Sequence, residues 1–502
     1  MIAGFLGALP AIALGWIIVR LLMPSENWKP AWLRWVMEIS LGTGIGLGLT
    51  SCLYFTLLWA GVLSRTLVMA SEAVLLLAAV ALLLVRRGRT KTEVPPAPGF
   101  SWNWVLRLAA VLALLLVALD FGQSTGSNPN GEWDAFSIWN VRARFLAGGA
   151  GTWRTAISNQ MAGQMVGANH PSYPLLVSSS VTRLWVLAND VALGPGEPAV
   201  LSLLFSLATA GLLCGAVAWI GAESVGLLAL LVLFATEGFV SQVASQYSDV
   251  PLSFYILGAI ALVAAASTRA WPTGLLILAG LCAGLSTWTK NEGTPFLVIT
   301  ILVVAWRAGI RPAAWLVAGA LPGGLMTAAF KFVLHPPGEA IFPKTVAEAF
   351  SKIIDPTRWL QIAVSFARNI WELGVPWAHP VLLMAIVAFA LRFAARKDLR
   401  SRWWLVLPVA GLLAVDFGVY LLTTAQLNWH LDTSNSRLFV QVWPALLFAF
   451  FVLVQPPVSA ELERVLITAG RRAEESERES TRKRAKNTSK TRKNDEKTRE
   501  IR

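Results

Sequence analysis

Long apolar runs separated by short polar segments recur along the chain from Ile2 to Val454. Most of these runs approach the roughly 20 residues that an α-helix needs to cross the hydrocarbon core of a bilayer. They lack the alternating period of a membrane β-strand, and only helices and closed barrels satisfy their backbone hydrogen bonds in lipid. The pattern therefore predicts an all-α, polytopic transmembrane bundle of about 13 spans. The predicted spans are 2–23, 39–61, 66–85, 103–121, 198–220, 224–244, 250–268, 272–289, 293–306, 313–334, 376–395, 403–424 and 437–455.

Composition agrees with lipid as the solvent of this bundle. Hydrophobic residues make up 55% of the 502 residues and charged residues only 14%, whereas about a quarter of a soluble protein is charged. Cys52, Cys214 and Cys282 all lie inside apolar runs, which predicts neither a disulfide framework nor a metal cluster. The stretch 1–23 lacks a basic leading region, so we expect a retained span rather than a signal peptide.

The net charge of +13 is distributed over short loops and a C-terminal tail. Basic clusters at 86–91, 307–311 and 396–402 mark cytoplasmic loops under the positive-inside rule. The tail, 458–502, is then also cytoplasmic; its composition predicts disorder and contact with anionic lipid head groups. Its basic residues are not interleaved with aromatics, so membrane lipids and not nucleic acid are the expected partners.

The same topology places 122–170, the turn at 290, and the loops 334–376 and 426–436 on the external side. The apolar segment 171–188 would break this alternation if it crossed the membrane. It contains three serines, a threonine and Arg183. We therefore interpret it as a helix that lies in the external interface or enters it partway.

Polar residues gather at five places that this topology puts on the external side. They are 131–134, 169–174, 246–251, 289–293 and the loop that carries His430, Asp432 and Arg437. Trp133, Phe136 and Trp139 near the first cluster predict an interfacial helix in the long external loop.

Three acidic residues are candidates for proton transfer. Glu132 and Asp134 are either helix-capping acids of a solvated loop or a pair in which one carboxylate accepts a proton from an acceptor hydroxyl. Asp249 opens an apolar span, where an ionisable group is costly unless it is paired or hydrated. The ordinary alternative for Asp249 is an N-terminal helix cap. Lys290, at the matching end of the neighbouring span, is either its ion-pair partner or a phosphate ligand.

Two arginines and a histidine extend the set. Arg142 follows Trp139 by one turn of the predicted interfacial helix. Arg437 opens the last span, where snorkelling to the interface is the alternative to binding a lipid phosphate. His170 could order its proline-flanked loop, contact a substrate, or bind a divalent metal beside Glu132. No cofactor other than this metal is suggested, because the sequence has no Walker A loop, GxGxxG or HExxH motif.

Together these segments resemble the GT-C superfamily of glycosyltransferases, multi-span enzymes that use polyprenyl-phosphate sugar donors at the outer face of a membrane. The most similar members are the bacterial enzymes related to protein O-mannosyltransferases and to the aminoarabinose transferase of lipid A. The resemblance runs from about Glu132 to Glu292, with a looser match near Arg437. Here the acidic residues follow the fourth predicted span and are spaced Glu-x-Asp.

The resemblance implies an inverting transfer of a sugar from a polyprenyl-phosphate donor to a lipid, glycan or protein acceptor, in a bacterial cell membrane. The implied catalytic carboxylates are Asp134, Glu132 and Asp249. The implied ligands of the donor phosphate are Lys290, Arg437 and Arg142. The implied substrate contacts are His170, Tyr173, Asn291, Glu292 and His430.

Four regions follow from this interpretation. They are N-terminal extra helices (1–100), a catalytic core with the external loop 122–170 (101–335), an external loop with C-terminal helices (336–457) and the tail (458–502).

Two other classes stay open. A transporter or a lipid or polysaccharide flippase would place ionisable groups within spans, which Asp120, Asp416, Glu72 and Glu237 keep open. A non-catalytic envelope scaffold would use the tail as a docking arm.

Overall fold

The computed structural model describes residues 1–24, 26–27, 30–85, 92–93, 103–158, 170–338, 341–375, 379–391 and 401–454. Among these residues the regular secondary structure is helical, apart from one two-residue parallel pairing of β1 (Glu26–Asn27) with β2 (Thr92–Glu93). The predicted tail and the basic clusters at 86–91 and 396–400 lie outside the described residues.

Nine described helices are long and apolar enough to cross a membrane. They are α1 (Ile2–Leu22), α2 (Ala31–Trp59), α3 (Arg65–Val85), α4 (Asn103–Ser127), α7 (Gly196–Ile220), α11 (Asp249–Ser267), α14 (Ile310–Phe332), α19 (Leu407–Leu422, with the short helix Trp403–Val406 before it) and α20 (Leu427–Leu453). A tenth span is formed if α8 (Glu223–Phe234) is counted with the helices α9 (Glu237–Val240) and α10 (Gln242–Ser245), which are bent from it by 75°. The prediction of a helical membrane protein is therefore confirmed.

Shorter apolar helices complete the bundle. They are α6 (Leu176–Ala188), α12 (Thr273–Thr289), α13 (Gly293–Ala308) and α17 (Pro380–Leu391). Every predicted span overlaps one of the apolar helices named above, while the number that cross the membrane stays a prediction.

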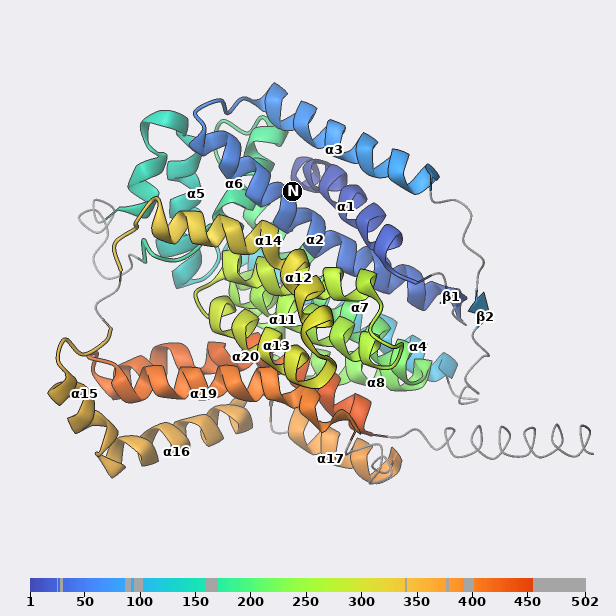
Figure 1. The fold of residues 1–502 in the computed structure, drawn as a ribbon, viewed down its shortest axis with the longest axis vertical. Helices are drawn as coiled ribbons and strands as arrows, with labels where there is room; N and C mark the ends of the chain where they lie inside the picture. The colour runs from blue at the N-terminus through green and yellow to red at the C-terminus, as the bar shows by residue number, and fades with distance from the viewer. Residues whose placement is uncertain are drawn as a thin grey trace, which may run out of the picture.

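The core is built around α11, which is almost wholly buried and contacts α2, α7, α12 and α20. Figure 1 shows α1–α3 on one side of this centre and α19 and α20 on the other. Glycines allow neighbouring helices to approach closely. A Cβ atom added at Gly280 of α12 would lie 1.9 Å from the Leu316 carbonyl oxygen of α14, and one at Gly15 of α1 would lie 2.0 Å from the Gly42 carbonyl oxygen of α2.

The segment 171–188 forms α6, whose 13 residues are fewer than the roughly 20 that cross a bilayer. Its polar side chains lie inside the protein and not on an exposed surface. The Ser178 and Thr182 hydroxyls donate to carbonyls of the 139–143 segment, and Arg183 forms two hydrogen bonds of 2.5 and 2.6 Å with Glu72 of α3. The short length fits a helix that does not cross, and its position relative to the membrane interface stays a prediction.

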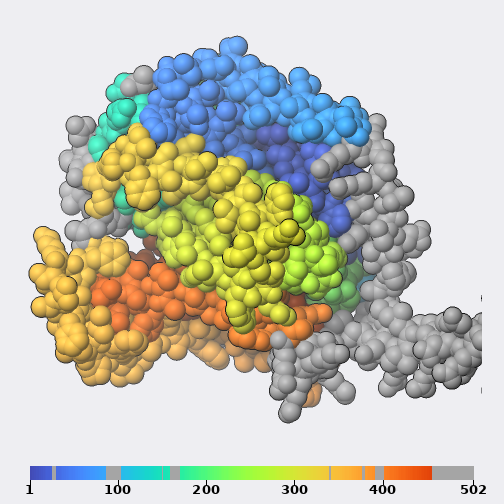
Figure 2. Space-filling model, viewed as in Figure 1, coloured from blue at the N-terminus to red at the C-terminus, as the bar shows by residue number. Residues whose placement is uncertain are grey.

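Two predicted loops are helical. Residues 426–436 are the N-cap and first turns of α20, and no glycine or proline interrupts the helix there. The predicted loop 334–376 contains α15 (Val346–Ile353) and α16 (Pro356–Glu372), which are N-capped by the side chains of Thr345 and Asp355. Figure 2 shows this α15–α16 segment at the edge of the molecule beside α19 and α20.

The external loop predicted at 122–170 begins later, because α4 continues to Ser127. A turn of π-helix (Ala135–Trp139) and α5 (Asn140–Ala147) follow, and the two together form the helix predicted from the aromatic residues. Residues 159–169 of this loop lie outside the described residues.

Candidate active site

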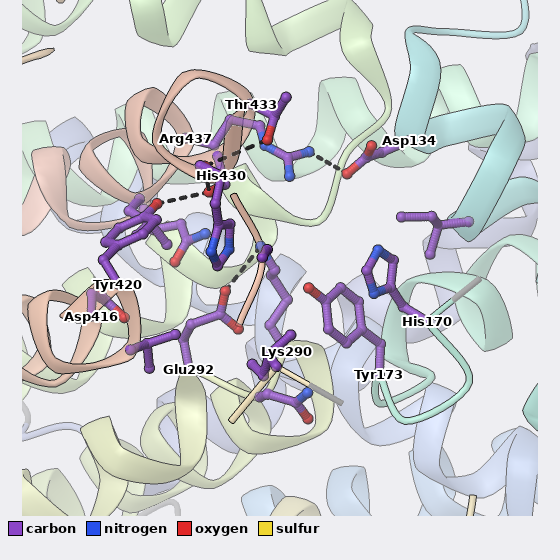
Figure 3. Close-up of a pocket in the computed structure, with 18 of the residues that line it drawn as sticks. Asp134, His170, Tyr173, Lys290, Glu292, Asp416, Tyr420, His430, Thr433 and Arg437 are labelled. Atoms are coloured by element: carbon purple, nitrogen blue, oxygen red, sulfur yellow. Dashed lines mark hydrogen bonds and ion pairs between the residues drawn. The ribbon is translucent and has the colours of Figure 1, made fainter. Parts of the chain in front are cut away.

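A cavity of about 730 Å³ lies where the polar ends of several helices meet. Its wall comes from the turn before the π-helix, the 170–173 segment, the α10–α11 turn, the α12–α13 turn, α19 and α20. Figure 3 shows the polar side chains of these segments converging on one space. The main polar side chains of the wall are Asp134, His170, Tyr173, Tyr247, Lys290, Asn291, Glu292, Asp416, Tyr420, His430, Thr433, Ser434, Arg437 and Gln441.

A tight turn places Asp134 in this wall. Gly131 has a positive φ of 75°, and a Cβ atom there would lie 2.6 Å from the Ser245 carbonyl oxygen, so the turn requires glycine. The next residue, Glu132, donates its backbone N–H to the same carbonyl. The chain is thereby fixed against the end of α10, and Asp134 points into the cavity.

Asp134 forms an ion pair with Arg437 of α20, whose Nη1 donates to the Asp134 carboxylate. The Arg437 guanidinium carbon lies 5.3 Å from the centroid of the Tyr247 ring, and the Tyr247 hydroxyl accepts the Asp134 backbone N–H at 3.3 Å. Burial raises the pKa of Tyr247 to about 12, so its phenol is neutral at physiological pH. The Arg437 Nε is buried and has no hydrogen-bond partner among the described residues.

A second charged cluster is centred on Lys290, directly after α12. Its Nζ lies 3.0 Å from Asp249 Oδ1 and 3.2 Å from Glu292 Oε1. Asp249, which is 1% exposed, also accepts a 2.6 Å hydrogen bond from Gln441 of α20. Burial alone would lower the pKa of Lys290, but the two carboxylates hold that pKa above its ordinary value, so the ammonium stays charged.

Aromatic and amide groups form the wall next to Lys290. The rings of His170 and Tyr173 stack with centroids 4.6 Å apart, and the Lys290 Nζ lies 5.9 Å from the Tyr173 centroid. Lys331, in the last turn of α14, donates to Asn291 Oδ1 at 2.7 Å and to the Ser172 carbonyl. Lys331 therefore ties the α12–α13 turn to the 170–173 segment.

Residues of α19 and α20 form the opposite wall. The Tyr420 hydroxyl lies 2.7 Å from Ser434 Oγ, and His430 Nδ1 lies 3.1 Å from Thr423 Oγ1. Asp416 also belongs to this wall and is 5% exposed. His430 thus reaches the cavity as predicted, although from a helix and not from a loop.

Three predicted site residues do not line the cavity: Asp249, which is paired with Lys290, and Glu132 and Arg142. Glu132 is exposed, and its carboxylate accepts a 3.3 Å hydrogen bond from Asn128. Arg142 does share a helix face with Trp139, but that face is turned into the protein. Arg142 donates to the carbonyls of Ala156 and Tyr173, at 2.9 and 2.7 Å. Arg142 therefore organises the loop and is not placed to bind a donor phosphate.

The predicted metal pair is also separated, because His170 lines the cavity while Glu132 does not. Within the described ranges no three His, Cys, Asp or Glu side chains are grouped so that they could hold a metal ion. The donor set therefore does not fit a divalent metal, and the chemistry below uses none.

Sequence reasoning assigned no role to Tyr247, although it lies in the predicted polar cluster 246–251, and it missed Lys331, Tyr420, Ser434 and Gln441. Lys331 and Gln441 left a usable signal, since each is a polar residue within an otherwise apolar run. The hydroxyl groups left none, because tyrosine and serine are common at span ends.

Comparisons with protein-family models, with curated proteins and with solved structures give no match for this chain. The helices and the cavity thus define the class: a helical integral membrane protein with a charged cavity at the ends of its helices.

Proposed function

We propose that this protein is a glycosyltransferase that moves a sugar from a polyprenyl-phosphate donor to an acceptor hydroxyl at the external face of a membrane. The observation that carries the proposal is the Asp134–Arg437 ion pair beside Lys290 in one cavity. Such a transfer needs a carboxylate to accept a proton and cations to stabilise the leaving phosphate. A donor anchored in lipid also suits a helical membrane protein without a nucleotide-binding motif.

The ion pair itself suggests how the donor prepares the base. A phosphate accepts the planar fork of an arginine in the same way as a carboxylate does. A donor phosphate near Lys290 therefore competes with Asp134 for Arg437. As Arg437 turns to the phosphate, the Asp134 carboxylate loses its partner and becomes a stronger base. The same movement of Arg437 therefore activates the base and stabilises the leaving phosphate.

The reaction is a single displacement. Asp134 takes the proton of the acceptor hydroxyl while the acceptor oxygen forms a bond to the anomeric carbon. The bond from that carbon to the phosphate oxygen breaks, and its electron pair leaves with polyprenyl phosphate. Attack opposite to the leaving group inverts the anomeric centre, and Asp134 then releases its proton to solvent.

Asp249 has a different part in this proposal. Its carboxylate is buried and is bound by both Lys290 and Gln441. Those contacts stabilise the ionised carboxylate and leave it a poor proton acceptor. We assign Asp249 the positioning of Lys290 and leave Asp134 as the base.

One observation favours a transporter or flippase as the second candidate. The helices α9 and α10 are bent by 75° from α8 and end just before the Tyr247 turn, and broken helices that lead to a polar site are typical of transporters. Of the four acids that kept this class open, Asp416 lines the cavity. Glu72 is instead neutralised by Arg183, and Asp120 and Glu237 are exposed.

The test uses the full-length protein in lipid nanodiscs with a panel of polyprenyl-phosphate sugars and an acceptor extract. We expect release of polyprenyl phosphate from at least one donor, and a loss of about 10²- to 10⁴-fold in Asp134→Asn, the range for removing a general base. Asp432→Asn, an exposed acid on the first turns of α20, is the matched control and should keep full activity.

Full activity of Asp134→Asn would overturn the proposal. The same donors are offered to proteoliposomes, where movement of the intact lipid-linked sugar between leaflets without release of polyprenyl phosphate would identify a flippase.

A further inference from the structure

Asp416 is a buried acid without a protein partner. It lies on α19 in the wall of the cavity and is 5% exposed. Among the described residues its carboxyl group makes no hydrogen bond and no ion pair, in contrast to Asp134 and Asp249. Burying such a group without hydrogen-bond donors is unfavourable. The side chain is therefore suited to a ligand that supplies donors.

Glu292 presents a second unsatisfied oxygen to the same space. Its Oε1 is 3.2 Å from the Lys290 Nζ, but its Oε2 is buried and has no hydrogen-bond partner in the described part of the chain. Figure 3 shows Glu292 between Lys290 and Asp416. Like Asp416, this oxygen lacks a donor.

The cavity wall has one part that carries the cations and another part that carries the acids Asp416 and Glu292. Its two cations are both ion-paired, Arg437 with Asp134 and Lys290 with Asp249 and Glu292. Asp416 is therefore the acid in excess. A ligand that complements both parts has an anionic group for the cations and O–H or N–H donors for the acids. A sugar joined to a phosphate has this arrangement.

We propose that Asp416 and Glu292 form an acidic subsite that accepts hydrogen bonds from the hydroxyl or ammonium groups of the donor sugar. This inference rests on the proposed function. It assigns to these two residues the recognition that distinguishes a sugar-bearing lipid from a bare lipid phosphate. Carboxylates bind hydroxyl pairs and ammonium groups through short, charge-assisted hydrogen bonds.

The experiment measures binding to the full-length protein in nanodiscs with three probes: polyprenyl phosphate, its neutral hexose conjugate and its amino-sugar conjugate. In Asp416→Asn we expect an unchanged or slightly higher affinity for polyprenyl phosphate. Affinity for a sugar-bearing lipid should fall about 10-fold for hydroxyl contacts and about 100-fold for an ammonium contact, following the strength of hydrogen bonds to charged groups. Asp432→Asn is the control and should bind all three probes as the unmodified protein does.

A thermal-unfolding measurement separates binding from folding. Because Asp416→Asn replaces a buried carboxyl group that has no partner among the described residues with an amide of similar size, the ligand-free variant should unfold at the same or a higher temperature than the unmodified protein. An equal loss of affinity for all three probes, or no loss for any, would overturn the acidic subsite while polyprenyl phosphate still binds. Failure of the unmodified protein to bind any lipid phosphate would overturn the proposed function and the subsite together.

Discussion

Arg437 and Asp134 are 303 residues apart in the sequence and form an ion pair in the wall of the cavity. One lies on the third turn of α20, and the other lies in a turn fixed against the end of α10. In the proposed mechanism this contact is a switch, because the same guanidinium pairs with the Asp134 carboxylate before the donor binds and with the leaving phosphate afterwards.

Replacing Arg437 by lysine tests that relationship. Lysine keeps the positive charge but cannot offer the planar fork that binds a phosphate bidentately. We expect kcat/KM for release of polyprenyl phosphate to fall by about 10- to 100-fold, the equivalent of one or two strong hydrogen bonds. The double variant with Asp134→Asn should lose less than the product of the two single losses, because the residues act as one unit. Strictly multiplicative losses would contradict the coupling.

The buried cluster around Lys290 yields a stability prediction. Asp249→Asn leaves the Lys290 ammonium with Glu292 as its remaining carboxylate, and breaking a buried pair costs about 3–5 kcal/mol. The apparent unfolding temperature of the variant in detergent should therefore drop. Asp249→Asn combined with Lys290→Met should recover part of that loss, since the uncompensated charge is gone. If the single variant unfolded at the original temperature, the pair would have no structural role.

These residues show how far the sequence could lead. The Asp249–Lys290 contact was one of the two alternatives that the sequence left open for Lys290, because both residues stand at the ends of apolar runs, where a charge needs a partner. Glu132 and Asp134 could not be separated in this way. They are two acids of one polar loop, and the packing of Gly131 against Ser245 decides which of them faces the cavity.

The start of α20 is a helical segment that the sequence pattern predicted as a loop. Residues 427–436 read as a loop because they lack an apolar run, yet they continue the helix and turn polar side chains toward the cavity. Hydropathy indicates contact with lipid and not helicity. A hydropathy pattern therefore does not detect a helical segment that lines a polar cavity. Gln441 and Asp416 were undervalued for a related reason, since each is a single polar residue within an apolar helix.

The Glu72–Arg183 pair yields a prediction about the N-terminal helices. Glu72 is one of only three buried residues on α3, and its two hydrogen bonds to Arg183 join α3 to α6. Glu72→Gln leaves the Arg183 charge buried without a carboxylate, so α3 should detach more readily and become sensitive to limited proteolysis. The double variant with Arg183→Met should be more resistant than the single one. Donor binding should change little in either, because neither residue lines the cavity; equal protease sensitivity of Glu72→Gln and the unmodified protein would contradict the prediction.

The outward face of α16 carries the last prediction. Trp359, Leu360, Val364 and Trp371 are exposed along one side of this helix, while Ser365 on the other side accepts a 2.8 Å hydrogen bond from Asn435 of α20. A helix with large apolar side chains on its exposed side is typical of contact with lipid. A fluorophore attached to Val364→Cys should therefore emit at shorter wavelength and be quenched by lipid-borne quenchers, whereas one on Asp432→Cys should not. The three native cysteines are buried and should not compete for the label. Equal emission and equal quenching at the two positions would show that α16 does not lie against the membrane.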